Sequence, residues 1–300
     1  MPLLVSSLPI LASKSRSRTS KDMGTSLPRH PLITLICLLI MLVWERVLNM
    51  VCVVRMLEKP KLDNPVLIEG LPGIGFVANI AALHLIQELK AKLFAEIHSS
   101  SFQDFAITAK EGKARFPINE LYYHKGRDEE ERDLIILYGN TQALTTIGQY
   151  ELCGRVLDVA EELGCHHIIT LGGLRREEKV DIPKLYCVAS DSETLQEPLS
   201  LGAETIGGQI FGVAGLLVGL GKLRGMKGFC LLAETLGFYP DATATREVLK
   251  AICKMLHLKI ELTRLDVAAE ATRSILESFG LTASPTGKRT EKELRSGWLI

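Results

Sequence analysis

The stretch Glu69–Gly75 (EGLPGIG) constrains the fold of this chain more than any other. It follows the apolar run Pro65–Ile68 and precedes a helix-like pattern that extends from Phe76 to about Lys90. Its glycines permit positive φ angles and let another backbone or a ligand approach closely. A turn between a strand and a helix also leaves free backbone N–H groups at the start of the helix, where an anion can bind.

The spacing of these glycines argues against two common nucleotide sites. The pattern is G-x-x-G-x-G, whereas the dinucleotide fingerprint is G-x-G-x-x-G, and no Gly-Lys-Ser/Thr ending of a phosphate-binding loop follows. The turn, with Gly70, Pro72, Gly73 and Gly75, therefore indicates a fold more strongly than it indicates a ligand.

Apolar strands alternate with helical patterns through the rest of the body. The run Leu134–Tyr138 is apolar and β-branched, as in a strand covered on both faces of a parallel sheet. A helical stripe follows over Leu152–Leu163, and Gly164 suits the position after the helix. His167–Leu171 and Gly228–Ala233 are further strand candidates. This alternation predicts an α/β fold, a three-layer domain with a mostly parallel central sheet.

Residues 105–124 depart from the alternation. They hold three short strand-like segments, Phe105–Thr108, Ala114–Phe116 and Glu120–His124, which are separated by polar residues. Lys110–Lys113 suits the hairpin turn between the first two segments. We therefore expect a small antiparallel excursion from the parallel sheet.

The tips of the buried strands form the candidate site. In an open α/β sheet the carboxyl ends of parallel strands meet at one edge, the usual place for a ligand crevice. Glu234 is the best acidic candidate there, as a base or a metal ligand, or else it bonds local backbone N–H groups and shapes the turn. Asn140, Thr141 and Gln142 either contact a ligand or set turn geometry, since Thr146-x-x-Gln149 matches a capping box. The candidate binding residues of this strand-tip edge are Gly70, Pro72, Gly73, Gly75, Asn140, Thr141, Gln142, Gly172, Gly173, Glu234 and Asp241.

No catalytic or metal-binding constellation is recognisable. The sequence contains no G-x-S-x-G elbow and no His-Glu-x-x-His helix. Its seven cysteines include no C-x-x-C pair, and the adjacent His166 and His167 would point to opposite faces of a strand. We predict no catalytic residue, no metal and no cofactor, and an enzymatic activity is left undecided. The clusters Gly126–Asp133 and Arg175–Lys179 are interpreted as solvated charge runs.

The charge balance and the placement of the cysteines limit the kinds of partner and the cellular compartment that we expect. Lys+Arg and Asp+Glu number 35 each, but residues 1–55 hold seven basic and two acidic residues, which leaves residues 56–300 mildly acidic. A mildly acidic body gives no electrostatic footprint for nucleic acid. Cysteines placed inside apolar runs favour buried thiols in a reducing compartment, so we expect a cytoplasmic protein.

Three segments follow from composition: a leader over residues 1–55, an α/β domain over 56–280 and a flexible tail over 281–300. Residues 1–30 lack periodicity and are expected to be disordered. Leu32–Trp44 is almost wholly apolar, but its 13 residues fall short of the roughly 20 that span a bilayer. Three explanations of the leader stay open. The start is assigned too far upstream of Met50 or Met56, the segment is a short membrane anchor, or it is a functional arm.

Five segments, in this order, resemble the proteasome assembly chaperone 2 (PAC2) family in its prokaryotic and archaeal branch. They cover about residues 60–280 and are Glu69–Gly75, Gly139–Gln142, Gly172–Gly173, Ile206–Leu217 and Glu234–Asp241. The resemblance implies a phosphorylase/hydrolase-like α/β fold, self-assembly into homo-oligomers, and binding to α subunits of the proteasome core. Some members of the family carry an ATP-grasp-like label, which implies the alternative of an enzyme acting on a nucleotide or carboxylate.

The end of the chain departs from the family pattern. Archaeal relatives dock on the proteasome through a C-terminal hydrophobic-Tyr-X motif, whereas this chain ends Trp298-Leu299-Ile300. Leu299 therefore stands where the tyrosine is expected. The leading hypothesis is a non-catalytic, chaperone-like oligomer; the alternatives are the strand-tip enzyme and a scaffold anchored in the membrane through Leu32–Trp44.

Overall fold

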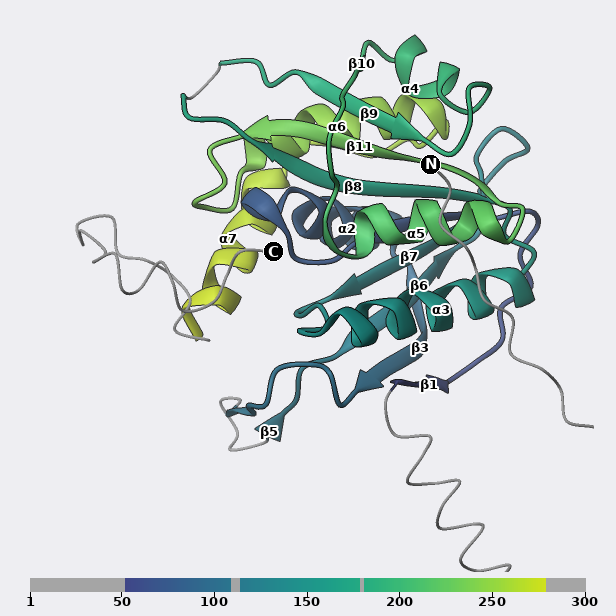
Figure 1. Cartoon of the computed structure of the whole chain (residues 1–300), viewed down its shortest axis with the longest axis vertical. Helices are drawn as coiled ribbons and strands as arrows, with labels where there is room; N and C mark the ends of the chain where they lie inside the picture. Colours follow the sequence, from purple (N-terminus) through teal and green to yellow (C-terminus); the bar gives the residue numbers. More distant parts are fainter. Residues whose placement is uncertain (1–51, 109–113, 179–180, 279–300) are drawn as a thin grey trace, which may run out of the picture. The chain divides into compact units, whose positions relative to one another are not determined.

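The computed structural model describes residues 52–108, 114–178 and 181–278, all within one compact unit of residues 47–300. Their main feature is a nine-stranded sheet in the order β1-β3-β6-β7-β2-β8-β11-β9-β10 (Figure 1). Two further strands, β4 (Ile107–Thr108) and β5 (Ala114–Arg115), form a separate antiparallel pair. The strands of the main sheet are β1 (Cys52–Met56), β2 (Val66–Gly70), β3 (Lys92–Ser99), β6 (Asn119–His124), β7 (Leu134–Gly139), β8 (His167–Arg175), β9 (Leu185–Ala189), β10 (Glu204–Thr205) and β11 (Lys227–Thr235).

The sheet is mixed. Its centre, β7-β2-β8-β11, is parallel throughout, and β9 pairs in parallel with β10. The pairings β1–β3, β3–β6, β6–β7 and β9–β11 are antiparallel. The α/β prediction is confirmed, whereas a mostly parallel sheet is not, because both flanks run antiparallel. In particular, the predicted segment Glu120–His124 lies in β6 and joins the main sheet instead of an excursion.

Helices cover both faces of the sheet. Helices α2 (Val77–Leu89), α6 (Ala242–Met255) and α7 (Leu265–Ser278) lie on one face, over the core cluster that contains Ile68, Ile136 and Phe229. Helices α3 (Thr146–Glu162) and α5 (Gly212–Leu223) lie side by side on the other face, in front of the sheet in Figure 1. A one-turn helix, α4 (Gln196–Ser200), and a 3-10 turn, η1 (Ile74–Phe76), complete the described elements.

Side-chain hydrogen bonds fix where α6 and α3 begin, and a glycine follows the end of α3. The Asp241 carboxylate accepts the backbone N–H of Ala244 at 2.9 Å and caps α6, as its sequence context predicts. Helix α3 is capped by Thr145, whose hydroxyl accepts the N–H of Gly148 at 3.0 Å, so the predicted capping box at Thr146 lies one residue too late. Gly164 takes a φ of 76° just after α3, which favours glycine.

Some predicted segments have a different structure from the one expected, and others lie outside the described residues. Four residues of the predicted leader, Cys52–Arg55, lie in β1, which the sequence analysis did not predict. The apolar segment Leu32–Trp44, the turn Lys110–Lys113 and the C-terminal Trp298–Ile300 lie outside the described residues. Among the residues that are described, no helix is both long and apolar enough to cross a bilayer.

Candidate functional site

The turn between β2 and α2 packs tightly on its surroundings. A Cβ atom on Gly70 would lie 2.2 Å from the Cβ of Ala82, so glycine lets α2 approach the sheet closely. Gly75 has a φ of 64°, and a Cβ there would lie 2.7 Å from the Thr235 hydroxyl. Gly73 has open space around it. Two of the three glycines are therefore required by the fold of the turn itself.

Gln142, at the tip of β7, holds three segments together. Its side-chain N–H donates to the carbonyl oxygen of Pro72 at 2.7 Å. Its side-chain oxygen accepts the backbone N–H of Val213 at 3.2 Å and the side-chain N–H of Gln149 at 3.2 Å. One amide thus joins the β2 tip to the first turns of α3 and α5.

Asn140 and Thr141 face the flank of the sheet instead of the β2 turn. The Asn140 side-chain oxygen accepts the N–H of Ile118 at 2.9 Å, which fixes the entry to β6. Thr141 is buried, and its hydroxyl lies 3.0 Å from the side-chain oxygen of Gln103. Both residues shape the tip of β7, in line with the turn-geometry alternative.

Gly172 and Gly173 do not form a turn. They lie within β8, which continues to Arg175 and pairs with β11 along its whole length. The 3-10 turn crosses directly over Gly173, because a Cβ there would lie 2.3 Å from the Ile74 carbonyl oxygen. The prediction that these glycines form the tip of their strand is therefore wrong, and they instead make room for the β2 turn and for Leu232.

Glu234 lies near the end of β11 and is almost fully buried. Arg176 donates to its carboxylate from Nε at 2.8 Å, Tyr186 donates its hydroxyl at 3.0 Å, and the Lys184 N–H donates at 3.2 Å. Burial acts to raise the pKa of Glu234, but these hydrogen bonds outweigh it and leave the pKa below its ordinary value. Sequence reasoning found no basic partner for Glu234, because it interpreted Arg176 as part of a solvated loop; the continuation of β8 brings that residue to the tip.

Asp241 joins the ends of β2 and β11. Its carboxylate accepts the Thr235 hydroxyl at 2.7 Å, and its N–H donates to the Gly75 carbonyl oxygen at 2.9 Å. A cleft of about 240 Å³ opens beside it at the tip of β11, lined by Glu234, Thr235, Tyr239 and the first residues of α6. The cleft is small, and its volume suits one side chain or a small polar molecule.

Exposed apolar side chains surround this cleft. Ile74 is 38% exposed, Phe238 62% and Tyr239 46%, all on turns at the strand-tip edge. The guanidinium of Arg175 lies over the Phe238 ring at 4.6 Å from its centre. Aromatic and arginine side chains of this kind are enriched at the centres of protein–protein interfaces.

Glu69 is a buried carboxyl group directly beneath the β2 turn. Its Oε1 accepts the N–H of Leu71 at 2.8 Å, whereas its Oε2 has no hydrogen-bond partner within the described residues. Burial raises the pKa of Glu69 to about 8, against the lowering effect of the hydrogen bond from Leu71. The side chain therefore helps to fix the turn, and sequence reasoning did not single it out.

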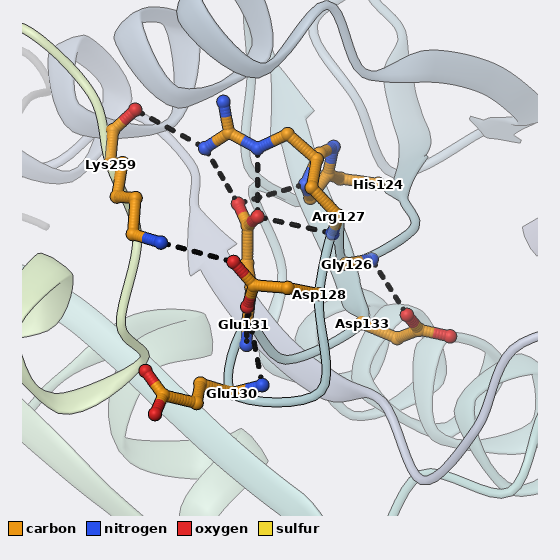
Figure 2. A network of polar contacts seen from close by, with 8 residues as sticks. All are labelled: His124, Gly126, Arg127, Asp128, Glu130, Glu131, Asp133 and Lys259. Carbon is orange, nitrogen blue, oxygen red and sulfur yellow. Dashed lines mark hydrogen bonds and ion pairs between the residues drawn. The ribbon is translucent and has the colours of Figure 1, made fainter.

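A second polar cluster lies at the opposite, amino edge of the parallel strands (Figure 2). The buried Glu131 carboxylate accepts Arg127 Nε at 2.7 Å and Nη2 at 2.9 Å, and lies 3.2 Å from His124 Nε2. Asp128 accepts Lys259 Nζ at 3.0 Å, which ties this connection to the segment after α6. The predicted solvated charge run is thus in part a buried network. Because the carboxylates of Asp128, Glu131 and Asp133 all accept hydrogen bonds, the cluster indicates a structural role.

Comparison with known proteins identifies the family. A family model described as the PAC2 family matches residues 67–279, more than half of the chain. The chain belongs to the PAC2 family. An uncharacterised protein of Methanocaldococcus jannaschii is 33% identical over 243 residues, which cover 78% of this chain and 92% of that relative. The resemblance stated from the sequence motifs is confirmed.

Two solved PAC2-fold structures are similar over nearly their whole length. Pyrococcus furiosus PbaB, described as an archaeal proteasome activator, is 41% identical with a TM-score of 0.70, covering 77% of this chain and 99% of that chain. Pyrococcus furiosus PbaA, described as an archaeal homolog of proteasome-assembly chaperone, is 25% identical with a TM-score of 0.62, covering 76% and 98%.

In this PAC2 chain the predicted site residues make contacts at three places. Pro72 meets Gln142, and Gly75 meets Asp241, around the β2 turn. Glu234 forms its own group with Arg176 and Tyr186 at the tip of β11. Asn140 accepts the Ile118 N–H on the β6 side.

Proposed function

We propose that this PAC2-family protein is a non-catalytic, proteasome assembly chaperone-like protein that binds subunits of the proteasome core. The observation that carries the proposal is the similarity to PbaB, at 41% identity over almost all of that chain. The fold shared with PbaA, an archaeal homolog of proteasome-assembly chaperone, adds support. By family resemblance, the expected partners within the core are its α subunits.

The strand-tip edge supports a binding role more than a catalytic one. Gln142 and Asp241 use their side chains to join segments of the edge, and Arg176 is occupied by Glu234. We propose that the strand-tip residues named from the sequence build this surface, while the neighbouring Arg175 and Phe238 contact the partner. A guanidinium stacked on an aromatic ring is rigid and still has donors for a carboxylate.

A capture experiment tests the proposal. The full chain, carrying an affinity tag, is used to recover partners from native lysate of its own organism, beside the double variant Arg175→Ala/Phe238→Ala. We expect proteasome α subunits with the wild type and several-fold less with the double variant. The matched control is Val267→Ala, which removes an exposed apolar side chain from α7. Absence of proteasome subunits together with nucleotide-dependent turnover would establish the enzyme alternative instead.

Further parts of the proposal concern assembly and organisation. We infer self-association into a homo-oligomer, a cytoplasmic location and a fold of the phosphorylase/hydrolase-like class. Support for the location comes from the six described cysteines, which are all free and mostly buried. We also propose the organisation into leader, domain and tail, with the start of the domain extended to include β1. The membrane alternative, through Leu32–Trp44, is settled by identifying the native N-terminus with mass spectrometry.

A further inference from the structure

The carboxyl group of Glu69, beneath the β2 turn, is incompletely hydrogen-bonded. Its Oε1 accepts the Leu71 N–H at 2.8 Å, whereas its Oε2 has no hydrogen-bond partner within the described residues. The residue is only 1% exposed. An ionised carboxylate in such a place is a negative charge away from water with one oxygen unpaired, whereas a neutral carboxyl group needs no counter-charge. The surroundings of Glu69 therefore favour its protonated form.

The groups that face Glu69 carry no charge to offset its own. By the alternation along β2, Glu69 shares a face with Leu67 and Leu71, on the side of α3 and α5, while α2 covers the opposite face. The titratable groups on its side are the thiols of Cys153 in α3 and Cys230 in β11, and burial raises the pKa of both, so they stay neutral where Glu69 titrates. The register neighbours in β7 and β8 and the buried side chains of α5 do not titrate; they are Leu137, Thr170, Val213 and Leu217.

The β2 turn, which covers Glu69, is bonded to both sides of the strand-tip edge. The Pro72 carbonyl oxygen accepts the Gln142 side chain at 2.7 Å, and Gln142 in turn holds the start of α5. The Gly75 carbonyl oxygen accepts the Asp241 N–H at 2.9 Å, at the start of α6. A displacement of the turn is therefore passed on to two helices.

The same turn supports the patch that we assign to the partner. Ile74 packs against Gly237, where a Cβ would lie 2.9 Å from Ile74 Cγ2, and Phe238 follows in the chain. Between Glu69 and Ile74, Gly73 has open space around it, so the turn has room to move at this point. Gly73 is partly exposed and Ile74 is 38% exposed. Along the chain from Glu69, the turn is therefore both the part with room to move and the nearest approach to water.

We propose that Glu69 is a pH-sensitive switch that controls partner binding at the strand-tip edge. This inference concerns the regulation of the proposed function and rests on it. While the carboxyl group is neutral, the β2 turn stays in place and the patch of Arg175 and Phe238 binds the partner. When the carboxyl group loses its proton, water enters through the turn to solvate the charge, Ile74 moves away from Gly237, and binding weakens.

The direction of the pH dependence follows from burial. Burial raises the pKa of Glu69 from 4.5 to about 8, so the folded protein is in the binding form at neutral pH and leaves it as the pH rises through about 8. One linked proton changes the affinity by at most about tenfold per pH unit above that point. Glu69→Gln is uncharged at every pH, and its amide oxygen can still accept the Leu71 N–H, so this variant should stay in the binding form.

Infrared difference spectroscopy on the full chain tests the proton itself. The wild-type spectrum minus that of Glu69→Gln should contain the C=O stretch of a neutral carboxyl group at about pH 7, and this band should disappear as the pH rises through about 8. Hydrogen exchange of residues 71–76 should be equal in the two proteins at about pH 7 and faster in the wild type at about pH 9. Absence of the band at pH 7, or equal exchange at both pH values, would overturn the switch. If the variant does not fold, the band is followed by titrating the wild type alone.

Binding to proteasome core particles purified from the same organism separates this inference from the proposed function. The wild type should bind several-fold more weakly at pH 9 than at pH 7, whereas Glu69→Gln should bind equally at both. The matched control, Glu151→Gln, makes the same change at a partly buried carboxylate of α3 and should keep the wild-type pH profile. Identical pH profiles of the wild type and Glu69→Gln would overturn the inference, while their binding would still support the proposed function. If none of the three proteins binds at either pH, the proposed function fails, and its regulation by Glu69 fails with it.

Discussion

Gly73 and Gly173 belong to the same corner of the molecule but differ in what surrounds them. A Cβ on Gly173 would lie 2.3 Å from the Ile74 carbonyl oxygen and 2.7 Å from Thr235 Cγ2, whereas a Cβ on Gly73 would meet nothing within 4 Å. The first position is fixed by the turn that crosses over it. The second has no such neighbour, so the described residues give no steric reason for glycine there.

Gly173→Ala is therefore expected to destabilise the fold by about 1–3 kcal/mol, because backbone atoms must move to admit the methyl group. Gly73→Ala should change the free energy of unfolding by less than about 0.5 kcal/mol, since its backbone is extended. Urea unfolding of the two variants beside the wild type measures both values. Equal effects at the two positions would contradict the close crossing of the β2 turn over β8.

Glu69 gives the stability a dependence on pH. Because the folded-state pKa of about 8 exceeds the ordinary value of 4.5, folding takes up a proton between these pH values. The stabilising contribution is complete below about pH 4.5 and is lost as the pH rises to about 8, at about 1.4 kcal/mol per pH unit. Glu69→Gln keeps an acceptor for the Leu71 N–H and should remove this slope. The free energies of unfolding of both proteins at pH 6 and pH 8 test this prediction. An equal change between these two pH values in the wild type and the variant would contradict it.

Among the elements, the connection between β6 and β7 differs most from its sequence interpretation. The residues of Gly126–Asp133 are largely charged, which by itself indicates a solvated loop. Glu131 and Asp133 are buried, because residues distant in the sequence, such as Lys259 and Asp63, form hydrogen bonds with the loop through their backbones. Periodicity and composition report on neighbours in sequence, so contacts of this range cannot be predicted from them.

Glu131→Gln is expected to lower the free energy of unfolding by about 2 kcal/mol at pH 7, since it leaves part of the Arg127 fork without its anion. Burial acts to raise the pKa of Glu131, but the Arg127 hydrogen bonds keep it below its ordinary value of 4.5. Its contribution is therefore present above that pH and is lost as the pH falls below it. Glu129→Gln, at an exposed position of the same loop, is the control and should have little effect. A difference between the Glu131 variant and wild type that persists unchanged at pH 3 would contradict this account.

For the whole molecule, the strands at the centre of the sheet could be predicted and the flanks could not. β2, β7, β8 and β11 are apolar runs covered on both faces, and each was recognisable from its residues alone. β1 was missed because only Cys52 in Cys52–Met56 is fully buried and the strand lies next to an unpatterned leader. The end of β8 was misread because two adjacent glycines resemble a turn, although here they make room for a neighbour.

The tail gives a prediction on assembly. If self-association is carried by the α/β domain, deletion of Trp298–Ile300 should leave the mass in solution unchanged. Light scattering of the truncated chain beside the full chain checks this. A lower mass after truncation alone would show that the tail takes part in self-association.

The parallel centre of the sheet has a consequence for how the chain is made. Ile68 of β2 pairs with Ile136 of β7 on one side and with Ile169 of β8 on the other. A ribosome that adds about 5–20 residues per second needs roughly 5–20 s to go from the first of these residues to the last. During that interval the nascent chain carries an apolar strand whose permanent neighbours have not all been synthesised. The protein proposed to assist the assembly of others therefore itself passes through a stage in which an unfinished sheet must be kept from aggregating.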